Sequence, residues 1–88
     1  AEVVRGGRIR GCGLLEMHFS LRGTLVRDVV LRGDYFEVAD AAAAFRETFT
    51  DIPFTPEGLQ QAVAQHHPER SIRGLDEQGL LKLLEQAL

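Results

Sequence analysis

The chain has 88 residues, of which 44% are hydrophobic and 26% charged, and its formal net charge is −3 at pH 7. This length predicts a single domain over residues 1–88 that buries only about 60–65% of the surface its unfolded form exposes, which excludes a large active-site cleft. The arginines are scattered rather than gathered in a basic tract, so nucleic acid and anionic membranes are disfavoured as partners. No apolar run approaches the ~20 residues that cross a bilayer, so no membrane partner is expected.

The redox setting follows from the single cysteine, Cys12, which cannot form a disulfide within the chain. No signal-peptide pattern precedes the first predicted strand. Both observations favour a reducing compartment, so a cytoplasmic location is expected.

The N-terminal part of the sequence is typical of antiparallel strands. Residues 1–13 hold β-branched residues interrupted by glycines, which predicts an edge strand or a short hairpin. Residues 14–22 alternate between apolar and polar side chains, as a strand with one buried face does. The side chains expected on that face are Leu15, Met17, Phe19 and Leu21.

The rest of the chain is organised around the stretch from Arg22 to Phe36, which reads RGTLVRDVVLRGDYF. Gly23 can supply the positive φ of a tight turn, so residues 24–32 should return antiparallel to the preceding strand. Gly33 is expected to stop this return strand, because glycine permits a sharp departure of the backbone.

The apolar residues of the return strand do not all fall on one side, so its alternation has imperfect parity. Val29 and Leu31 fall on one side of it, whereas Val26 and Val30 fall on the other. A bulge near Arg27-Asp28 would explain this pattern, and so would burial of both faces at the centre of the sheet.

From Val38 onward the apolar period changes to three or four residues, which is the period of a helix. The spacing predicts a first amphipathic helix from Val38 to about Phe49, followed by a connector over residues 50–54. Thr55 should cap a second helix that ends before Pro68. The inward side of this second helix should carry Leu59, Ala62 and Val63.

A polar loop over residues 69–74 separates the second helix from a third, which Asp76 should cap. The apolar stripe of the third helix should be Leu80, Leu81, Leu84 and Leu88. Strands followed by helices indicate an α+β domain, in which a small antiparallel sheet of about three strands is covered on one face by three helices.

Cys12 is a candidate for chemistry, because it lies between two glycines just before the clearest strand. An exposed thiol with a lowered pKa could accept persulfide sulfur or ligate a cluster. Only Arg8 and Arg10 are near it in sequence, and a second cysteine is missing. An inert small residue at the entry of a strand is therefore favoured over a reactive thiol.

The three histidines do not form a metal site by their spacing. The adjacent His66 and His67 point about 100° apart on a helix and cannot both chelate, and the carboxylate nearest to them, Glu69, lies beyond the break at Pro68. The helix dipole explains a histidine pair at a helix C-terminus. No metal ligand is predicted at these positions or at His18.

The sequence also lacks the residues that nucleotide binding and nucleophilic catalysis need. The sequence contains no GxxxxGK[ST] or GxGxxG loop and no recognisable Ser-His-Asp or Cys-His arrangement. Its one lysine, Lys82, falls in the middle of the third predicted helix, so a catalytic lysine of an adenylating site cannot come from this chain. We expect no catalytic, cofactor-binding or metal-binding residue in it.

The candidate partner-docking residues are Gly33, Asp34, Tyr35 and Phe36. Two aromatic side chains at the end of a strand form either a packing plug against the helices or a recognition patch. Packing is favoured for the aromatic side chains, and Asp34 is expected to contact the partner.

Several segments, in this order, resemble the small accessory, or C-terminal, domain of bacterial and archaeal lipoate–protein ligases. They are a Gly-rich lead-in with a hydrophobic strand (GCGLLEMHFSL), a strand ending in Gly-Asp-aromatic-Phe (RDVVLRGDYF), a helix entry (IPFTPEGL) and a closing segment (SIRGLDEQGLLKLL). The resemblance extends from about Gly6 to Leu88. The sequence departs from the family pattern at Tyr35, where many members have Phe, and at Gly79, where a better helix former is expected.

The resemblance implies a fold similar to the SufE/NifU-like fold of sulfur-transfer and iron–sulfur scaffold domains. In such ligases a large catalytic domain activates lipoate with ATP and Mg²⁺ as lipoyl-AMP and transfers it to a lysine of a lipoyl carrier domain. The small domain carries no catalytic residue, supports the activation step, and is either fused to the large domain or a separate subunit of a heterodimer. The alternative from a different class is a sulfur-transfer or iron–sulfur scaffold-like module acting through Cys12.

Overall fold

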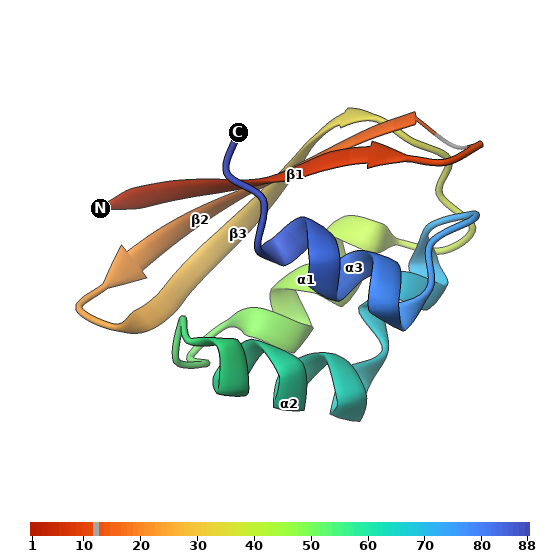
Figure 1. The fold of residues 1–88 in the computed structure, drawn as a ribbon. Coiled ribbons are helices and arrows are strands. Elements are labelled where there is room, and N and C mark those ends of the chain that lie inside the picture. The colour runs from red at the N-terminus through yellow and green to blue at the C-terminus, as the bar shows by residue number, and fades with distance from the viewer. Residues whose placement is uncertain (12) are drawn as a thin grey trace.

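The computed structural model describes residues 1–11 and 13–88. Within these residues, three strands form one antiparallel sheet in the order β1-β2-β3, with bounds Glu2–Ile9, Gly13–Arg22 and Leu25–Asp34. In the same part of the chain, the helices are α1 (Ala41–Phe49), α2 (Pro56–His66), the 3-10 helix η1 (Pro68–Ser71) and α3 (Glu77–Leu84). The helices lie together on one face of the sheet (Figure 1), which confirms the predicted α+β class.

The predicted buried face of β2 forms the centre of the core. The side chains of Leu15, Met17 and Phe19 have no exposed surface. The Phe19 ring lies 5.6 Å from the Phe49 ring of α1 and 5.0 Å from the Phe54 ring of the connector, measured between centroids. Aromatic contacts at these distances add to the stabilisation from burial alone, so this cluster joins the sheet to the helices.

β1 is the edge strand that was one of the two predicted alternatives, and it passes through Gly6 and Gly7 without turning. The C-terminal residues pair with its outer edge, because Gly6 N–H donates to the Gln86 carbonyl at 3.0 Å and Leu88 N–H donates to the Val4 carbonyl at 3.3 Å. This pairing covers unpaired backbone groups of the edge strand.

The same pairing makes the predicted stripe of α3 wrong at its last member. The helix ends at Leu84, so Leu88 lies outside it and is exposed. Leu83, which is not in the predicted stripe, is buried with Leu80 and Leu84, and Leu81 is partly buried.

β3 is longer than predicted, and Gly33 does not stop it. Gly33 pairs with Leu15 and Asp34 pairs with Leu14, so the strand continues through the glycine. Gly33 adopts a φ of 119°, and an added Cβ would collide with the Leu14 carbonyl oxygen, so glycine is required here by the close approach of β2.

Of the two explanations for the imperfect parity of β3, the bulge is confirmed. Ser20 pairs with Asp28, but the next residue of β2, Leu21, pairs with Val26, which leaves Arg27 as the extra residue. The bulge explains why Val26 and Val29 are both buried although they are three residues apart. Val30 remains exposed on the uncovered face of the sheet.

The first helix begins at Ala41, three residues later than predicted. Asp40 caps it, because its Oδ1 accepts a hydrogen bond from Ala43 N–H at 3.1 Å. Val38 N–H instead donates to the Ser71 carbonyl at 2.9 Å, so the backbone of Val38 is bonded to η1 and not to the helix. Val38 is exposed and does not belong to the helical stripe.

The two predicted helix caps, Thr55 and Asp76, are confirmed. Thr55 Oγ1 accepts from Gly58 N–H at 3.0 Å, and Asp76 Oδ1 accepts from Gly79 N–H at 2.7 Å. The predicted inward residues of α2 are all buried: Leu59, Ala62 and Val63. The predicted polar loop between α2 and α3 is wrong in part, since it begins as η1 and buries Glu69 and Ser71.

Candidate docking surface

The predicted docking residues lie where β3 ends, and they differ in how far their side chains are buried. Asp34 is exposed at the last position of the strand. Tyr35 packs partly buried against the core, and burial raises the pKa of its phenol, with a further increase from the nearby Glu37 carboxylate. Phe36 is 60% exposed. The expectation that the aromatic side chains pack is therefore confirmed for Tyr35 and wrong for Phe36.

The backbone after Tyr35 is fixed by a short antiparallel bridge in which Glu37 pairs with Ile72. Arg73 N–H donates to the Phe36 carbonyl at 2.9 Å on one side of this bridge, and Val38 N–H donates to the Ser71 carbonyl on the other. Phe36 and Val38, one on each side of Glu37, are therefore both tied through their backbones to the segment 71–73.

We call Asp34, Phe36 and Val38 the docking edge. Val38 is 62% exposed, similar to Phe36, so two large apolar side chains face outward next to a carboxylate. A shallow hollow of about 410 Å³ adjoins them and is lined by residues 31–37. Sequence reasoning missed Val38 because its spacing fits the helical stripe, although Asp40 ahead of the alanine run signals where that helix begins.

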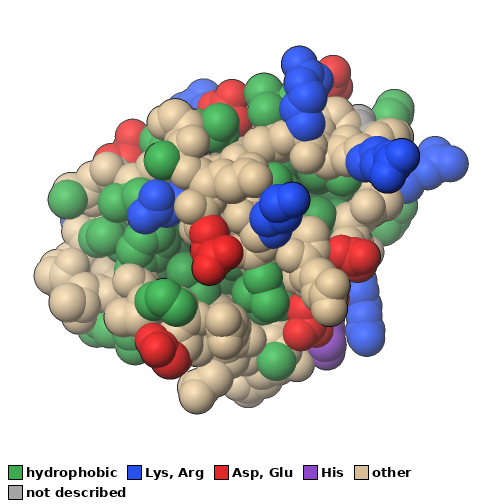
Figure 2. All heavy atoms as spheres, in the orientation of Figure 1, with side chains coloured by type: hydrophobic (Ala, Val, Ile, Leu, Met, Phe, Trp, Pro, Cys, Tyr) green, Lys and Arg blue, Asp and Glu red, His purple; other side chains and the backbone are tan. Residues whose placement is uncertain are grey.

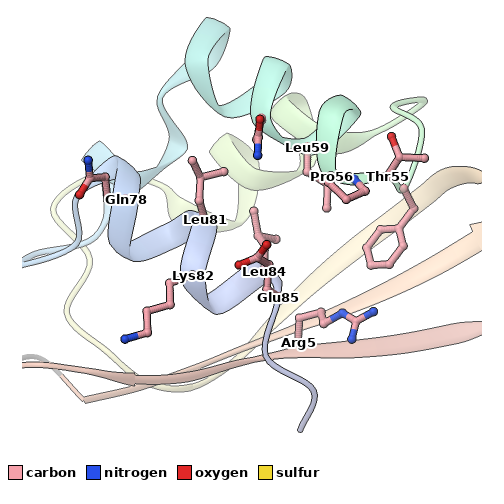
Figure 3. A pocket seen from close by; sticks show the side chains of 11 residues that line it. Arg5, Thr55, Pro56, Leu59, Gln78, Leu81, Lys82, Leu84 and Glu85 are labelled. Carbon is pink, nitrogen blue, oxygen red and sulfur yellow. The ribbon is translucent and has the colours of Figure 1, made fainter.

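A second concave feature lies between α2 and α3 on the side of the molecule where Figure 2 shows apolar side chains between charged ones. This groove has a volume of about 450 Å³, and its apolar lining includes Phe54, Leu59 and Leu81. Arg5 reaches into it from β1 (Figure 3), with its guanidinium carbon 5.5 Å from the centre of the Phe54 ring. This lining combines apolar side chains with one guanidinium group, as small-molecule pockets commonly do.

The single lysine, Lys82, is exposed on α3 and lines the same groove. Cys12, the candidate for sulfur chemistry, lies outside the described residues. Among the helices that the structure describes, none combines the length and hydropathy needed to cross a membrane.

The histidines have different surroundings. His18 lies on the uncovered face of the sheet, with Nε2 3.0 Å from Glu16 Oε1. His66 is exposed in the last turn of α2, whereas His67 follows the helix in a left-handed conformation. The structure brings His67, but not His66, into a cluster with two carboxylates from η1 and α3. Sequence spacing could not reveal this cluster, because one carboxylate, Glu77, is ten residues away.

Comparisons with known proteins agree with this fold. The family model described as bacterial lipoate protein ligase C-terminus matches residues 2–84. A solved archaeal lipoylation system from Thermoplasma acidophilum, a bi-partite lipoate protein ligase and its E2 lipoyl domain, contains a chain of similar structure. The match has a TM-score of 0.75 and 14% sequence identity, and it covers 97% of this chain and 96% of that chain.

No curated protein sequence is detectably similar to the chain. The family model nevertheless spans the sheet and all the helices described above, from the first residue of β1 to the last residue of α3. The chain therefore belongs to the family of bacterial lipoate protein ligase C-terminal domains.

Proposed function

We propose that this chain is a non-catalytic accessory domain or subunit of a lipoate–protein ligase. It docks on a large catalytic domain and supports the ATP-dependent activation of lipoate to lipoyl-AMP at that domain. The observation that carries this proposal is the family match over residues 2–84. The shared fold with a chain of the bi-partite ligase from Thermoplasma acidophilum supports a large partner on a separate chain or a fused domain.

In this proposal the cofactors and substrates belong to the partner. ATP, Mg²⁺ and lipoate bind the large catalytic domain, and lipoyl carrier domains receive the product in the cytoplasm. This chain contributes a surface, for which the docking edge has suitable chemistry. Exposed aromatic and aliphatic side chains on a rigid backbone are the kind of anchors that dominate binding energy in protein interfaces.

The docking edge is also well placed for a partner that must be held in one orientation. Phe36 and Val38 are fixed through the backbone bridge to residues 71–73. A preorganised surface loses little conformational entropy when it binds. The neighbouring Asp34 adds a charge that favours one orientation over others.

The test is an assay of pyrophosphate release from ATP and lipoate. The large catalytic domain from the same source is measured with and without this chain, and the chain is also measured alone. The proposal expects activity from the mixture that exceeds the activity of the large domain alone, and none from this chain by itself. A rate that this chain leaves unchanged would contradict the proposal.

A further inference from the structure

We propose that His67, Glu69 and Glu77 bind a divalent transition-metal ion, with zinc as the ion that their chemistry favours. His67 Nδ1 lies 3.0 Å from Glu69 Oε2 and 3.4 Å from Glu77 Oε1. One ligand atom from each of the three residues lies within 4.8 Å of the other two. Imidazole and carboxylate are both zinc ligands, whereas Mg²⁺ and Ca²⁺ prefer oxygen ligands alone.

The distances fit the size of a zinc site. Zinc binds nitrogen and oxygen ligands at about 2.0–2.2 Å, so ligand atoms at the corners of a tetrahedron lie about 3.4 Å apart. The distances from His67 Nδ1 to the two carboxylates, 3.0 and 3.4 Å, are close to this value. The ligand atoms of Glu69 and Glu77 lie within 4.8 Å of each other, so an approach of these two carboxylates would complete the site.

Glu69 provides evidence that is independent of the spacing. Its side chain is only 6% exposed, and its Oε1 is buried without a hydrogen-bond partner among the residues that the structure describes. A buried carboxylate is costly unless it is paired or coordinates a metal. An ion bound between His67 Nδ1 and Glu69 Oε2 would replace the proton that these two atoms share in the structure. It would also neutralise the buried carboxylate whose Oε1 has no partner among the described residues.

The three ligands come from three different elements. His67 is the C-cap that follows α2, Glu69 lies in η1, and Glu77 is the first residue of α3. His67 and Glu77 are partly exposed, so water can supply a fourth ligand. A bound ion would clamp the end of α2 to the start of α3, and this role does not depend on the proposed accessory function.

A protonated His67 that bridges the two carboxylates would give the same distances without a metal. The experiment separates the two by titrating zinc chloride into the folded chain, followed by calorimetry and by thermal unfolding. The Cys12→Ser background is used so that the thiol contributes no zinc binding. Magnesium chloride serves as the comparison ion.

The proposal expects one zinc ion per chain. At a zinc concentration about ten times the dissociation constant, the melting temperature should rise by at least about 5 °C. Magnesium at the same concentration should give no such rise. Absence of zinc binding at millimolar concentration would overturn the proposal and support the protonated bridge.

Substitutions of the proposed ligands test where zinc binds. His67→Asn keeps a residue type that tolerates the left-handed conformation but removes the imidazole, and Glu77→Gln removes one carboxylate. Each should weaken zinc binding by at least about tenfold, whereas the matched control His66→Gln should leave it unchanged. Circular dichroism confirms that each variant is folded. Equal zinc affinity in the parent protein and in either folded ligand variant would overturn the assignment.

Discussion

The two ends of β3 are held in different ways. At its beginning, Val26 N–H donates to the Ile52 carbonyl at 2.9 Å, and the Val26 carbonyl accepts from Asp51 N–H at 2.8 Å. The Val26 side chain is fully buried there. At the other end the strand passes through Gly33 into the exposed docking edge.

This difference separates a part of the strand that stabilises the fold from a part that is available for the proposed docking. The bulge at Arg27 turns Val26 toward the helices, and the connector then covers the backbone of that end. The far end keeps its backbone fixed through residues 71–73 but leaves its apolar side chains outside the core. Substitutions at the buried end should therefore change stability, and substitutions at the docking edge should change association.

The largest effect is expected at the core beside the buried end. Phe19, which pairs with Val29, is fully buried against two other aromatic rings. Phe19→Ala should lower the free energy of unfolding by about 3–5 kcal/mol, because it removes apolar contacts and leaves a cavity. Urea denaturation followed by circular dichroism measures this change. A loss below about 1 kcal/mol would show that the core is not organised as described.

Gly33 lies near the docking edge but has a structural role. Gly33→Ala would place a Cβ against the Leu14 carbonyl oxygen in a backbone conformation with φ of 119°. We expect a loss of about 1–3 kcal/mol in unfolding free energy, from the same urea experiment. Gly23→Ala is a control, since a Cβ there meets no atom within 4 Å although its φ is also positive. A larger loss at Gly23 than at Gly33 would contradict the role of the close strand approach.

Phe36 should behave in the opposite way. Phe36→Asp is expected to weaken association with the large catalytic domain by about tenfold or more, while the free energy of unfolding changes by less than about 0.5 kcal/mol. Calorimetry and urea denaturation measure the two quantities. The matched control is Leu25→Asp, which alters an exposed apolar side chain at the other end of β3. Equal weakening by both variants would remove the distinction between the ends.

Asp34 should give the smallest effect. Asp34→Ala is expected to weaken association by about two- to fivefold with little change in stability, since a single exposed charge contributes about 0.2–1 kcal/mol. The difference between the variant and the parent should shrink as salt is added, because salt screens exposed charges. If the variant loses stability and association in equal measure, Asp34 is merely structural.

Local patterns predicted much of the fold. The alternation in residues 14–22 identified the buried face of β2, and the broken parity around Arg27 indicated a bulge as one of two explanations. The caps Thr55 and Asp76 were also readable, because a helix N-cap needs only its own side chain and the next turn of backbone.

The features that sequence reasoning missed depend on contacts between distant segments. Leu88 leaves the stripe of α3 because the C-terminus pairs with β1. Val38 leaves α1 because its backbone bonds to Ser71, and Phe36 is exposed because the same bridge fixes its segment. The approach of His67 to Glu77 likewise requires α2, η1 and α3 to pack together. None of these contacts leaves a periodic pattern in the sequence around the residues that make it.

The most direct test of the account is to titrate the large catalytic domain into the isotopically labelled chain and follow its amide resonances. The account predicts that the amides of Phe36, Val38 and the supporting residues 71–73 change, while those of residues 24–26 keep their positions. Changes confined to residues 24–26, or to the groove around Leu59 and Leu81, would contradict the assignment of the docking edge.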